Sequence, residues 1–398
     1  MKLKHKLFLV VFLLPVFLFA YDFGLTAKIN PEFGGSGEAD FFFRGDLWPR
    51  LSVLIGDNAE LYVSAGLTFD YSDTFTFIPE LLRAEFSARF GNSGIKIGRI
   101  NYSDPLSFIA SGLFDGAQYY LNTGAGRFSA GILYTGLLYK KTAGITMTDN
   151  DIENYILPLD YSNFLDTYFA PRKLIGALDW SHPSVFNLLR LNSSVILQFD
   201  LSGSGVKYHS QYLILKGAFQ TGRFLIEAGG AVEFSQLTEN NDSKFRAAFA
   251  GDLGLTWLLP AAFNSALSFS GKIAGGRIND TFGEFTPVTG INFGNIFKKK
   301  ISALSFFDLN YSARFNNNIS ASLSTASFIR NDLAVVTGYP ITNDSSGYFL
   351  GQEIYADFTW MPFSDLRLNA GGGIFIPGLG NSEKPYWRVD LNIIISIL

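Results

Sequence analysis

The sequence predicts an all-β protein, a closed antiparallel transmembrane β-barrel of about 18 strands, with roughly 16 as the alternative. Three observations support this fold class. Apolar and polar residues alternate in segment after segment. Aromatic residues make up 16% of the chain and charged residues only 17%, which is an oily composition for a soluble protein. The connections between these segments are alternately short and long.

The final segment, YWRVDLNIIISIL, shows the alternation most clearly. Every second residue from Trp387 to Ile397 is apolar, whereas the positions between them carry Arg388, Asp390 and two further polar residues. Successive side chains of a strand point to opposite faces, so this strand has one apolar face and one charged face. The same pattern recurs in AELYVSAGLTFDYS, LLRAEFSARF, KFRAAFAGDLGLTWLL, FFDLNYSARF and EIYADFTWM. Soluble β-sandwiches and β-helices also alternate, but these apolar faces are long enough for the ~9–11 residues of a membrane-crossing strand.

The expected strands are joined alternately by tight turns and longer loops, as in outer-membrane barrels. We expect strands at 22–30, 38–55, 59–71, 80–91, 93–101, 112–122, 126–138, 172–181, 190–201, 209–220, 223–236, 244–259, 263–275, 303–316, 318–331, 347–361, 365–377 and 385–398. We expect tight turns at 56–58, 91–93, 122–125, 221–222, 259–262, 316–318 and 362–364, and the longest loops at 139–171 and 276–302. Interfacial tryptophans fit this topology: Trp48, Trp180, Trp257 and Trp360 are expected at the short-turn end and Trp387 at the other.

Residues 1–20 predict a secretory signal peptide, which leaves residues 21–398 as a single barrel domain. Lys2, Lys4 and Lys6 precede an apolar run that ends at Ala20. A membrane anchor is the alternative, but a run of about 14 apolar residues is short for a spanning helix. Loss of the three lysines leaves 28 basic residues against 35 acidic ones, a formal charge of −7. This balance argues against nucleic-acid binding, which requires a basic surface.

By its alternating strands and its final strand, the chain resembles bacterial outer-membrane β-barrel proteins of the porin kind. The resemblance covers essentially all of the mature chain. It implies a place in the outer membrane of a Gram-negative cell, contact with outer-membrane lipids, and recognition of the C-terminal strand by the barrel-assembly machinery. That recognition signal usually ends on an aromatic residue, whereas this chain ends on Ile397 and Leu398. Monomer and trimer both remain open.

A barrel of this strand number is wide enough for an aqueous channel unless something fills it. Inward-facing charged residues would line the conduit and set its ion preference, or would form cross-strand ion pairs within the wall. The mixture of signs does not predict selectivity. The candidate pore-lining residues are Arg83, Glu85, Arg89, Arg127, Asp200, Arg223, Glu227, Arg246, Asp252, Asp308, Arg314, Glu353, Asp357, Arg388 and Asp390.

Residues 141–171 form the best candidate for a constriction. If this loop folds inward, its acidic residues would narrow and charge the pore; an outward surface loop is the alternative. The candidate constriction residues are Asp149, Asp151, Glu153, Asp160 and Asp166. Their spacing is not that of an EF-hand calcium loop. Lys298–Lys300, on the other long loop, are expected to be a solvated charge run, with contact to surface phosphates as the alternative.

The function that these patterns favour is passive diffusion of small hydrophilic solutes or ions. One alternative is a surface adhesin or structural barrel with a loop-blocked pore, and another is a specific transporter of lipophilic or sugar substrates. The inward aromatics that would indicate a transporter are Phe42, Tyr120, Phe328 and Tyr355. No nucleotide-binding or nucleophile motif occurs, the chain has no cysteine, and no cofactor or metal is expected. His209 near Asp200 is the one conceivable catalytic dyad.

Overall fold

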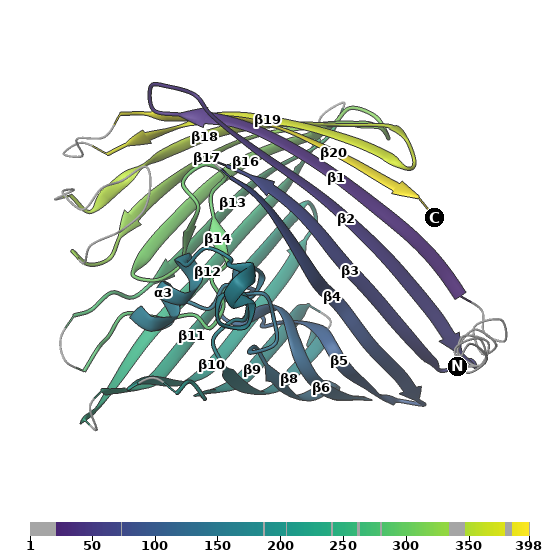
Figure 1. The fold of residues 1–398 in the computed structure, drawn as a ribbon, viewed down its shortest axis with the longest axis vertical. Helices are drawn as coiled ribbons and strands as arrows, with labels where there is room; N and C mark the ends of the chain where they lie inside the picture. The colour runs from purple at the N-terminus through teal and green to yellow at the C-terminus, as the bar shows by residue number, and fades with distance from the viewer. Residues whose placement is uncertain are drawn as a thin grey trace.

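The computed structural model describes residues 21–72, 74–185, 188–203, 205–239, 242–260, 263–278, 281–333, 347–378 and 384–397. Within these ranges 18 strands form one sheet, each antiparallel to the next long strand, and the pairing of β1 with β20 closes it (Figure 1). The all-β, 18-stranded closed barrel predicted from the sequence is confirmed. The predicted signal peptide, residues 1–20, lies outside the described residues, as do Leu398 and part of the 259–262 turn.

The secondary structure of the described chain consists of wall strands, a few short helices and one small hairpin. The wall strands are β1 (Tyr21–Gly35), β2 (Asp40–Ile55), β3 (Ala59–Tyr71), β4 (Phe75–Phe90), β5 (Ser93–Ser103), β6 (Ser111–Thr123), β7 (Gly126–Tyr134), β8 (Lys173–Val185), β9 (Leu189–Asp200), β10 (Val206–Thr221), β11 (Phe224–Glu239), β12 (Asp242–Leu259), β13 (Asn264–Ala274), β16 (Leu304–Arg314), β17 (Ile319–Arg330), β18 (Phe349–Phe363), β19 (Leu366–Pro377) and β20 (Tyr386–Ile397). The helices are α2 (Lys140–Ala143), α3 (Asp149–Ile156), α4 (Phe164–Tyr168) and the 3-10 helix η2 (Tyr161–Asn163), and the hairpin pairs β14 (Asn292–Phe293) with β15 (Lys299–Lys300).

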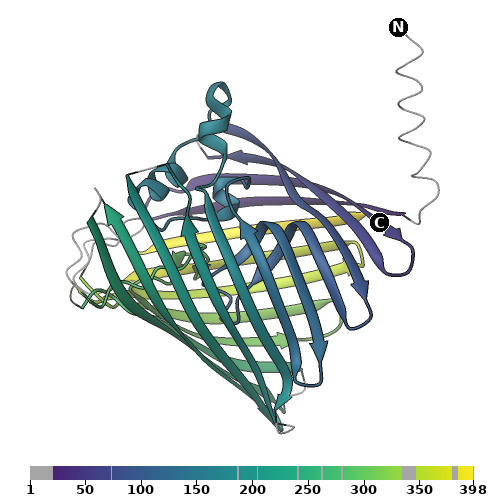
Figure 2. The ribbon, with the colours of Figure 1, turned by 90° about the horizontal axis from the view of Figure 1, so that it is seen from below.

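The two ends of the barrel differ, as the alternation of short and long joins predicts. Gly56, Gly91 and Gly222 stand in tight turns with φ of +62°, +57° and +54°, a backbone conformation that glycine adopts without strain. Leu25 of β1 lies opposite Ile397 of β20, so both ends of the barrel sheet lie on the short-turn side. Figure 2 shows the hairpin turns at one end of the wall and the helices near the other.

Strand β7 is shorter than predicted: it ends at Tyr134 and not at residue 138. The reason is a turn in which the Leu138 N–H donates to the carbonyl of Thr135 at 3.0 Å. The Thr135 hydroxyl also donates to the carbonyl of Pro171 at 2.6 Å, which ties the two ends of the long loop together. The chain therefore leaves the wall at this point and enters the barrel lumen.

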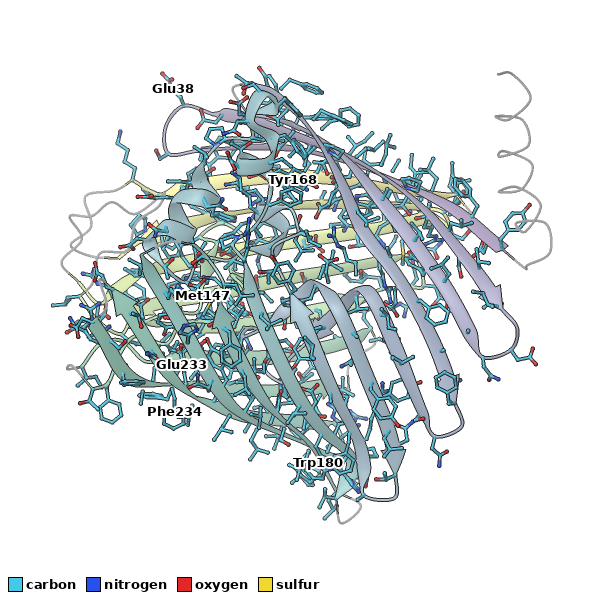
Figure 3. All side chains as sticks on the ribbon, turned by 60° about the horizontal axis from the view of Figure 1, so that its bottom comes forward. Glu38, Met147, Tyr168, Trp180, Glu233 and Phe234 are labelled. Carbon is cyan, nitrogen blue, oxygen red and sulfur yellow. The ribbon has the colours of Figure 1, made fainter. Side chains whose placement is uncertain are left out.

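The outer face of the wall is apolar and exposed, and the inner face is polar. On β20, Val389 and Ile397 are 52% and 58% exposed. On β11, Phe234 is 48% exposed on the outside, whereas its neighbour Glu233 is fully buried on the inside (Figure 3). No helix within the described ranges is long and apolar enough to cross a membrane. The strands thus form a wall with a hydrocarbon-compatible exterior.

Most of the tryptophans occupy the positions expected for a membrane interface. Trp257 and Trp360 are exposed near the short-turn ends of β12 and β18, and Trp180 lies close to the short turns in Figure 3. The interfacial position predicted for Trp48 is wrong. Trp48 lies in the middle of β2, seven residues before the short-turn end at Ile55. It pairs with Thr26, two residues from the pair of Lys28 and Asp46, so it also shares their inward face.

Charge on the outer face is expected to destabilise the barrel. Leu253 is 48% exposed in the middle of β12. Leu253→Arg should lower the free energy of unfolding by roughly 2–4 kcal/mol, because the guanidinium would lie in hydrocarbon. Ser270→Arg is the matched control, since Ser270 pairs with Asp308 on the inner face. Urea titration of the protein refolded in lipid vesicles measures both variants, and equal losses would contradict the assignment of the two faces.

Candidate channel and its inner segments

Three stretches between wall strands enter the barrel, and we call them the inner segments: residues 104–110, 135–172 and 275–303. The first crosses toward β11, where Leu106 approaches Gly229 so closely that a Cβ on the glycine would lie 2.6 Å from the leucine Cδ2. The third contacts β10, where the ring of Tyr212 meets Phe285 edge-on with centroids 6.0 Å apart. Both wall residues face inward, so these segments occupy the lumen.

The inner segments and the inner wall share one hydrophobic core. Phe297, which is fully buried, lies between two wall aromatics with ring centroids 4.9 Å from Phe328 of β17 and 4.6 Å from Phe375 of β19. Tyr355 of β18 packs at the edge of this core. The predicted inward aromatics Phe328 and Tyr355 therefore serve packing of the inner segments, since one is buried against Phe297 and the other borders the same cluster.

Two glutamates on distant strands anchor residues 275–303. Glu233 of β11 accepts the Thr286 N–H at 2.7 Å and the Tyr208 hydroxyl at 2.7 Å. Glu353 of β18 accepts the three consecutive N–H groups of residues 295–297 at 2.7, 2.8 and 3.0 Å. Arg388 of β20 donates to the carbonyl of Asn295 at 3.0 Å. Residues 275–303 are therefore bound to β11 on one side of the strands they connect and to β18 and β20 on the other, by charged groups.

Asp104 organises the shortest inner segment. Its carboxylate accepts four backbone N–H groups between residues 106 and 110, at 2.8 to 2.9 Å. Ser107 has a φ of +62°, a left-handed conformation that lets the chain curl around this carboxylate. The segment is tied to its neighbour because the Val288 N–H donates to the carbonyl of Ile109 at 2.7 Å.

Lysines connect the long loop to the wall and to the hairpin. The Lys173 ammonium, fully buried, lies 2.7 Å from Asp200 of β9 and 3.0 Å from Asp151 of α3. The Lys300 ammonium donates to the Thr146 carbonyl at 2.8 Å. Burial lowers the pKa of Lys300, against the opposing effect of the nearby acids. The expected solvated run at Lys298–Lys300 is thus wrong for Lys300, which is enclosed by the inner segments.

The candidate constriction loop both enters the lumen and reaches the rim. Ile145 is fully buried in the core and Met147 is 8% exposed. Of the five candidate acids only Asp151 is buried, in its ion pair with Lys173. The other four are exposed: Asp149, Glu153, Asp160 and Asp166.

Many candidate pore-lining residues form ion pairs along the inner wall. Glu85 binds Arg83 at 2.7 Å and Lys96 at 3.2 Å. Asp252 lies between Lys216 and Lys272, at 2.7 and 2.6 Å. Besides Asp200, which pairs with Lys173, the further candidates in ion pairs are Glu227 with Arg190 at 3.6 Å and Arg388 with Glu32 at 2.8 Å and with Asp390 at 3.3 Å.

The other candidates form no ion pair within the described ranges: Glu353, which accepts backbone N–H groups instead, and Arg89, Arg127, Arg223, Arg246, Asp308, Arg314 and Asp357. Arg127 stacks on Tyr120, with the guanidinium carbon 4.0 Å from the ring centroid. Arg223 lies in the turn before β11 and not on the strand expected from the sequence. Asp308 and Asp357 stand on the inner faces of β16 and β18.

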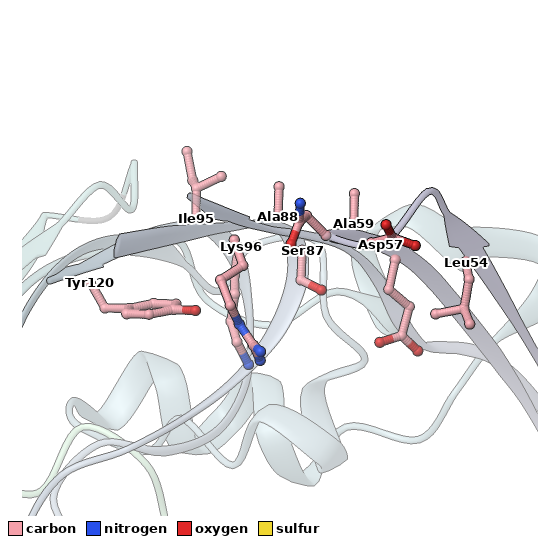
Figure 4. A pocket seen from close by; sticks show the side chains of 11 residues that line it. Leu54, Asp57, Ala59, Ser87, Ala88, Ile95, Lys96 and Tyr120 are labelled. Carbon is pink, nitrogen blue, oxygen red and sulfur yellow. The ribbon is translucent and has the colours of Figure 1, made fainter. Parts of the chain in front are cut away.

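A polar hollow of about 260 Å³ lies on the inner wall near the short turns. Its lining includes Arg89, Lys96, Glu60 and Tyr120. Figure 4 shows Lys96 and Tyr120 on the side of the wall that faces the helices, while Ile95 points to the opposite side. Two cations thus meet the lumen at its short-turn end.

The conceivable dyad of His209 and Asp200 does not have catalytic geometry. The imidazole Nδ1 accepts the backbone N–H of Asp200 at 3.1 Å, and the Asp200 carboxylate binds Lys173. Among the described residues, no three His, Asp or Glu side chains gather as a metal site.

No protein-family model matches the sequence, and no curated protein matches it by sequence. Solved structures from Pseudomonas aeruginosa do share its fold. OccK5 (OpdH) has a TM-score of 0.61 at 12% identity, covering 95% of this chain and 98% of that one. The outer membrane protein OpdK has a TM-score of 0.60 at 11% identity, covering 95% and 98%. OccK2 (OpdF), solved in complex with glucuronate, has a TM-score of 0.59 at 11% identity, covering 95% and 96%. The chain has the porin-type barrel fold expected from the sequence.

Proposed function

We propose that the mature chain is an outer-membrane channel through which small hydrophilic solutes or ions diffuse passively. The observation that carries the proposal is a closed barrel of 18 strands with an apolar exterior and a charged interior. A barrel of this width leaves room for an aqueous passage beside the inner segments that fill part of the lumen. The fold it shares with OpdK, an outer membrane protein, supports the same location. Under this proposal the protein has no enzymatic activity.

The proposal assigns roles to the charged residues of the inner wall. Arg83, Glu85, Asp252 and the other candidates would line the conduit, and the inner segments would set its narrowest passage. Loop acids exposed at the rim, such as Glu153, would meet solutes first. Cleavage of residues 1–20 and recognition of β20 by the barrel-assembly machinery belong to the same proposal. Either a monomer or a trimer is compatible with it.

A second candidate function follows from the inner segments. Their fully buried core, which includes Phe108, Phe285 and Phe297, fills part of the lumen. A barrel blocked in this way would act at the cell surface as an adhesin or structural protein.

Single-channel recording separates the two candidates. Residues 21–398, refolded and inserted into a planar lipid bilayer, should give discrete, stable current steps in potassium chloride. The reversal potential in a salt gradient then gives the ion preference. A β-rich, heat-modifiable protein that inserts but carries no current would contradict the channel proposal and favour the surface role.

A further inference from the structure

A large cavity lies at the mouth of the barrel, between the inner wall and the long loop. Its volume is about 710 Å³, within the range typical of small-molecule sites. One side is formed by β2, β3 and β4, including Thr68, Thr76 and Glu80, and the other by residues 139–159. Because the turn between β3 and β4 is on the long-loop side, this cavity faces the outer mouth.

The described lining of the cavity combines hydroxyl groups with charged groups of both signs. Its hydroxyl-bearing residues are Thr68, Ser72, Thr74, Thr76, Thr142, Tyr139 and Tyr155. The carboxylates Asp70 and Glu80 and the cations Arg44 and Lys141 also belong to it, and Arg44 is already paired with Asp46 at 3.3 Å. The described lining therefore does not concentrate charge of one sign, and it offers many hydrogen-bond donors and acceptors.

Several of these polar groups are held in fixed positions. The Thr142 hydroxyl donates to one oxygen of Glu80 at 2.9 Å, whereas the other Glu80 oxygen is shielded from solvent and has no hydrogen-bond partner among the described residues. The Lys141 ammonium lies 4.0 Å from the centre of the Tyr155 ring. Burial, and then the charge of Glu80, raise the pKa of Tyr139 to about 12, so its phenol remains a donor at neutral pH.

Apolar surface completes the lining. Ile78 of β4 faces Ile156 and residues 157–159 of the loop across the cavity. The tyrosine rings add flat apolar surface with a polar tip. A ligand that matches this lining must be rich in hydroxyl groups, carry no net charge and present C–H faces to the rings and aliphatic side chains.

We propose that this cavity binds an uncharged saccharide, a mono- or disaccharide, at the outer mouth of the barrel. The inference rests on the proposed channel function and deepens it by naming a class of solute. The loop side of the cavity is docked on the wall, since the Tyr168 hydroxyl donates to the Pro79 carbonyl at 2.7 Å and that of Tyr161 to the Phe77 carbonyl. A bound saccharide would bridge the wall and the loop.

Calorimetry of the refolded protein tests the inference. Maltose and glucose are titrated as neutral probes and gluconate as an anionic one, in a detergent without a sugar headgroup. Maltose should bind saturably, and Thr76→Val and Tyr155→Leu should each weaken binding about tenfold, the loss expected for one ligand hydrogen bond or ring contact. Thr256→Val is the matched control: this inner-wall hydroxyl lies near the short turns, 3.2 Å from that of Ser268, and its loss should leave maltose binding unchanged.

Three results would overturn the inference: absence of saturable maltose binding, equal binding by wild type and the cavity variants, or tighter binding of gluconate than of glucose. Recording currents from the same preparation separates this outcome from failure of the channel proposal. Protein that conducts salt but does not bind maltose retains the channel and loses the saccharide site. Protein that binds maltose but carries no current retains the site and loses the channel.

Discussion

Glu353→Ala is expected to increase the single-channel conductance and to make the open current noisier. Glu353 accepts the N–H groups of residues 295–297. Without this carboxylate three N–H groups lose their acceptor, at a cost of roughly 1–3 kcal/mol for each one that stays buried. They regain hydrogen bonds most easily when the hairpin leaves the wall and enters water. The lumen then widens, and planar-bilayer recording measures the change.

Asp357→Ala provides a control in the same strand. Asp357 lies four residues farther along β18 on the same inner face, and its one hydrogen bond to a described residue is accepted from the Thr359 hydroxyl at 3.5 Å. This variant removes an equal charge from the lumen without releasing a segment, so its conductance should shift only slightly. A similar change in both variants would mean that the charge, and not the anchored hairpin, governs the current.

Lys173→Met should reduce the free energy of unfolding by about 3–5 kcal/mol, because two buried carboxylates would lose their shared cation. The Lys173 and Asp200 side chains are both fully buried, and that of Asp151 is 4% exposed. Chemical denaturation in micelles, followed by tryptophan fluorescence and by heat-modifiable gel mobility, measures the loss.

Arg190→Met is the matched comparison for this ion pair. Arg190 lies 3.6 Å from Glu227, but its side chain is 55% exposed. Exposed pairs of this kind contribute at most about 1 kcal/mol. Adding Asp151→Asn and Asp200→Asn to Lys173→Met should recover much of the stability, since no uncompensated charge remains. Equal losses for Lys173→Met and Arg190→Met would show that burial of the Lys173 pair has no energetic role.

The wall could be predicted from the sequence because its physical cause is local. Each strand has lipid on one face and the lumen on the other, so its hydrophobicity alternates with a period of two residues. Segments such as KFRAAFAGDLGLTWLL can therefore be recognised as strands from the sequence. Closure follows because an unpaired edge is unfavourable in hydrocarbon. The alternation does not identify what an inward side chain contacts. The short-turn position expected for Trp48 is wrong because it rests on the interfacial preference of tryptophan, whereas the alternation places this side chain on the inner face.

The inner segments could not be predicted from the alternation of apolar and polar residues. The same alternation occurs whether the inner face of a strand contacts water or protein. Glu353 and Asp357 look equivalent in sequence, yet one is buried against backbone N–H groups and the other is not. A usable signal was present in residues 104–110, DPLSFIA, which are too apolar for a solvated loop. The same holds for the phenylalanines of the 275–303 segment. Which wall strands these residues meet depends on the closed barrel, which is not local information.

The clamping of residues 275–303 by β11 and β18 has a consequence for the order of assembly. Glu233 enters the wall more than a hundred residues before Glu353 does. If the strands join the wall in chain order, the segment has its first anchor on β11 and lacks its second until β18 is placed. An incomplete barrel would then hold residues 275–303 at one point only. Placement of β18 would therefore extend the wall and fix the inner segment in the same step.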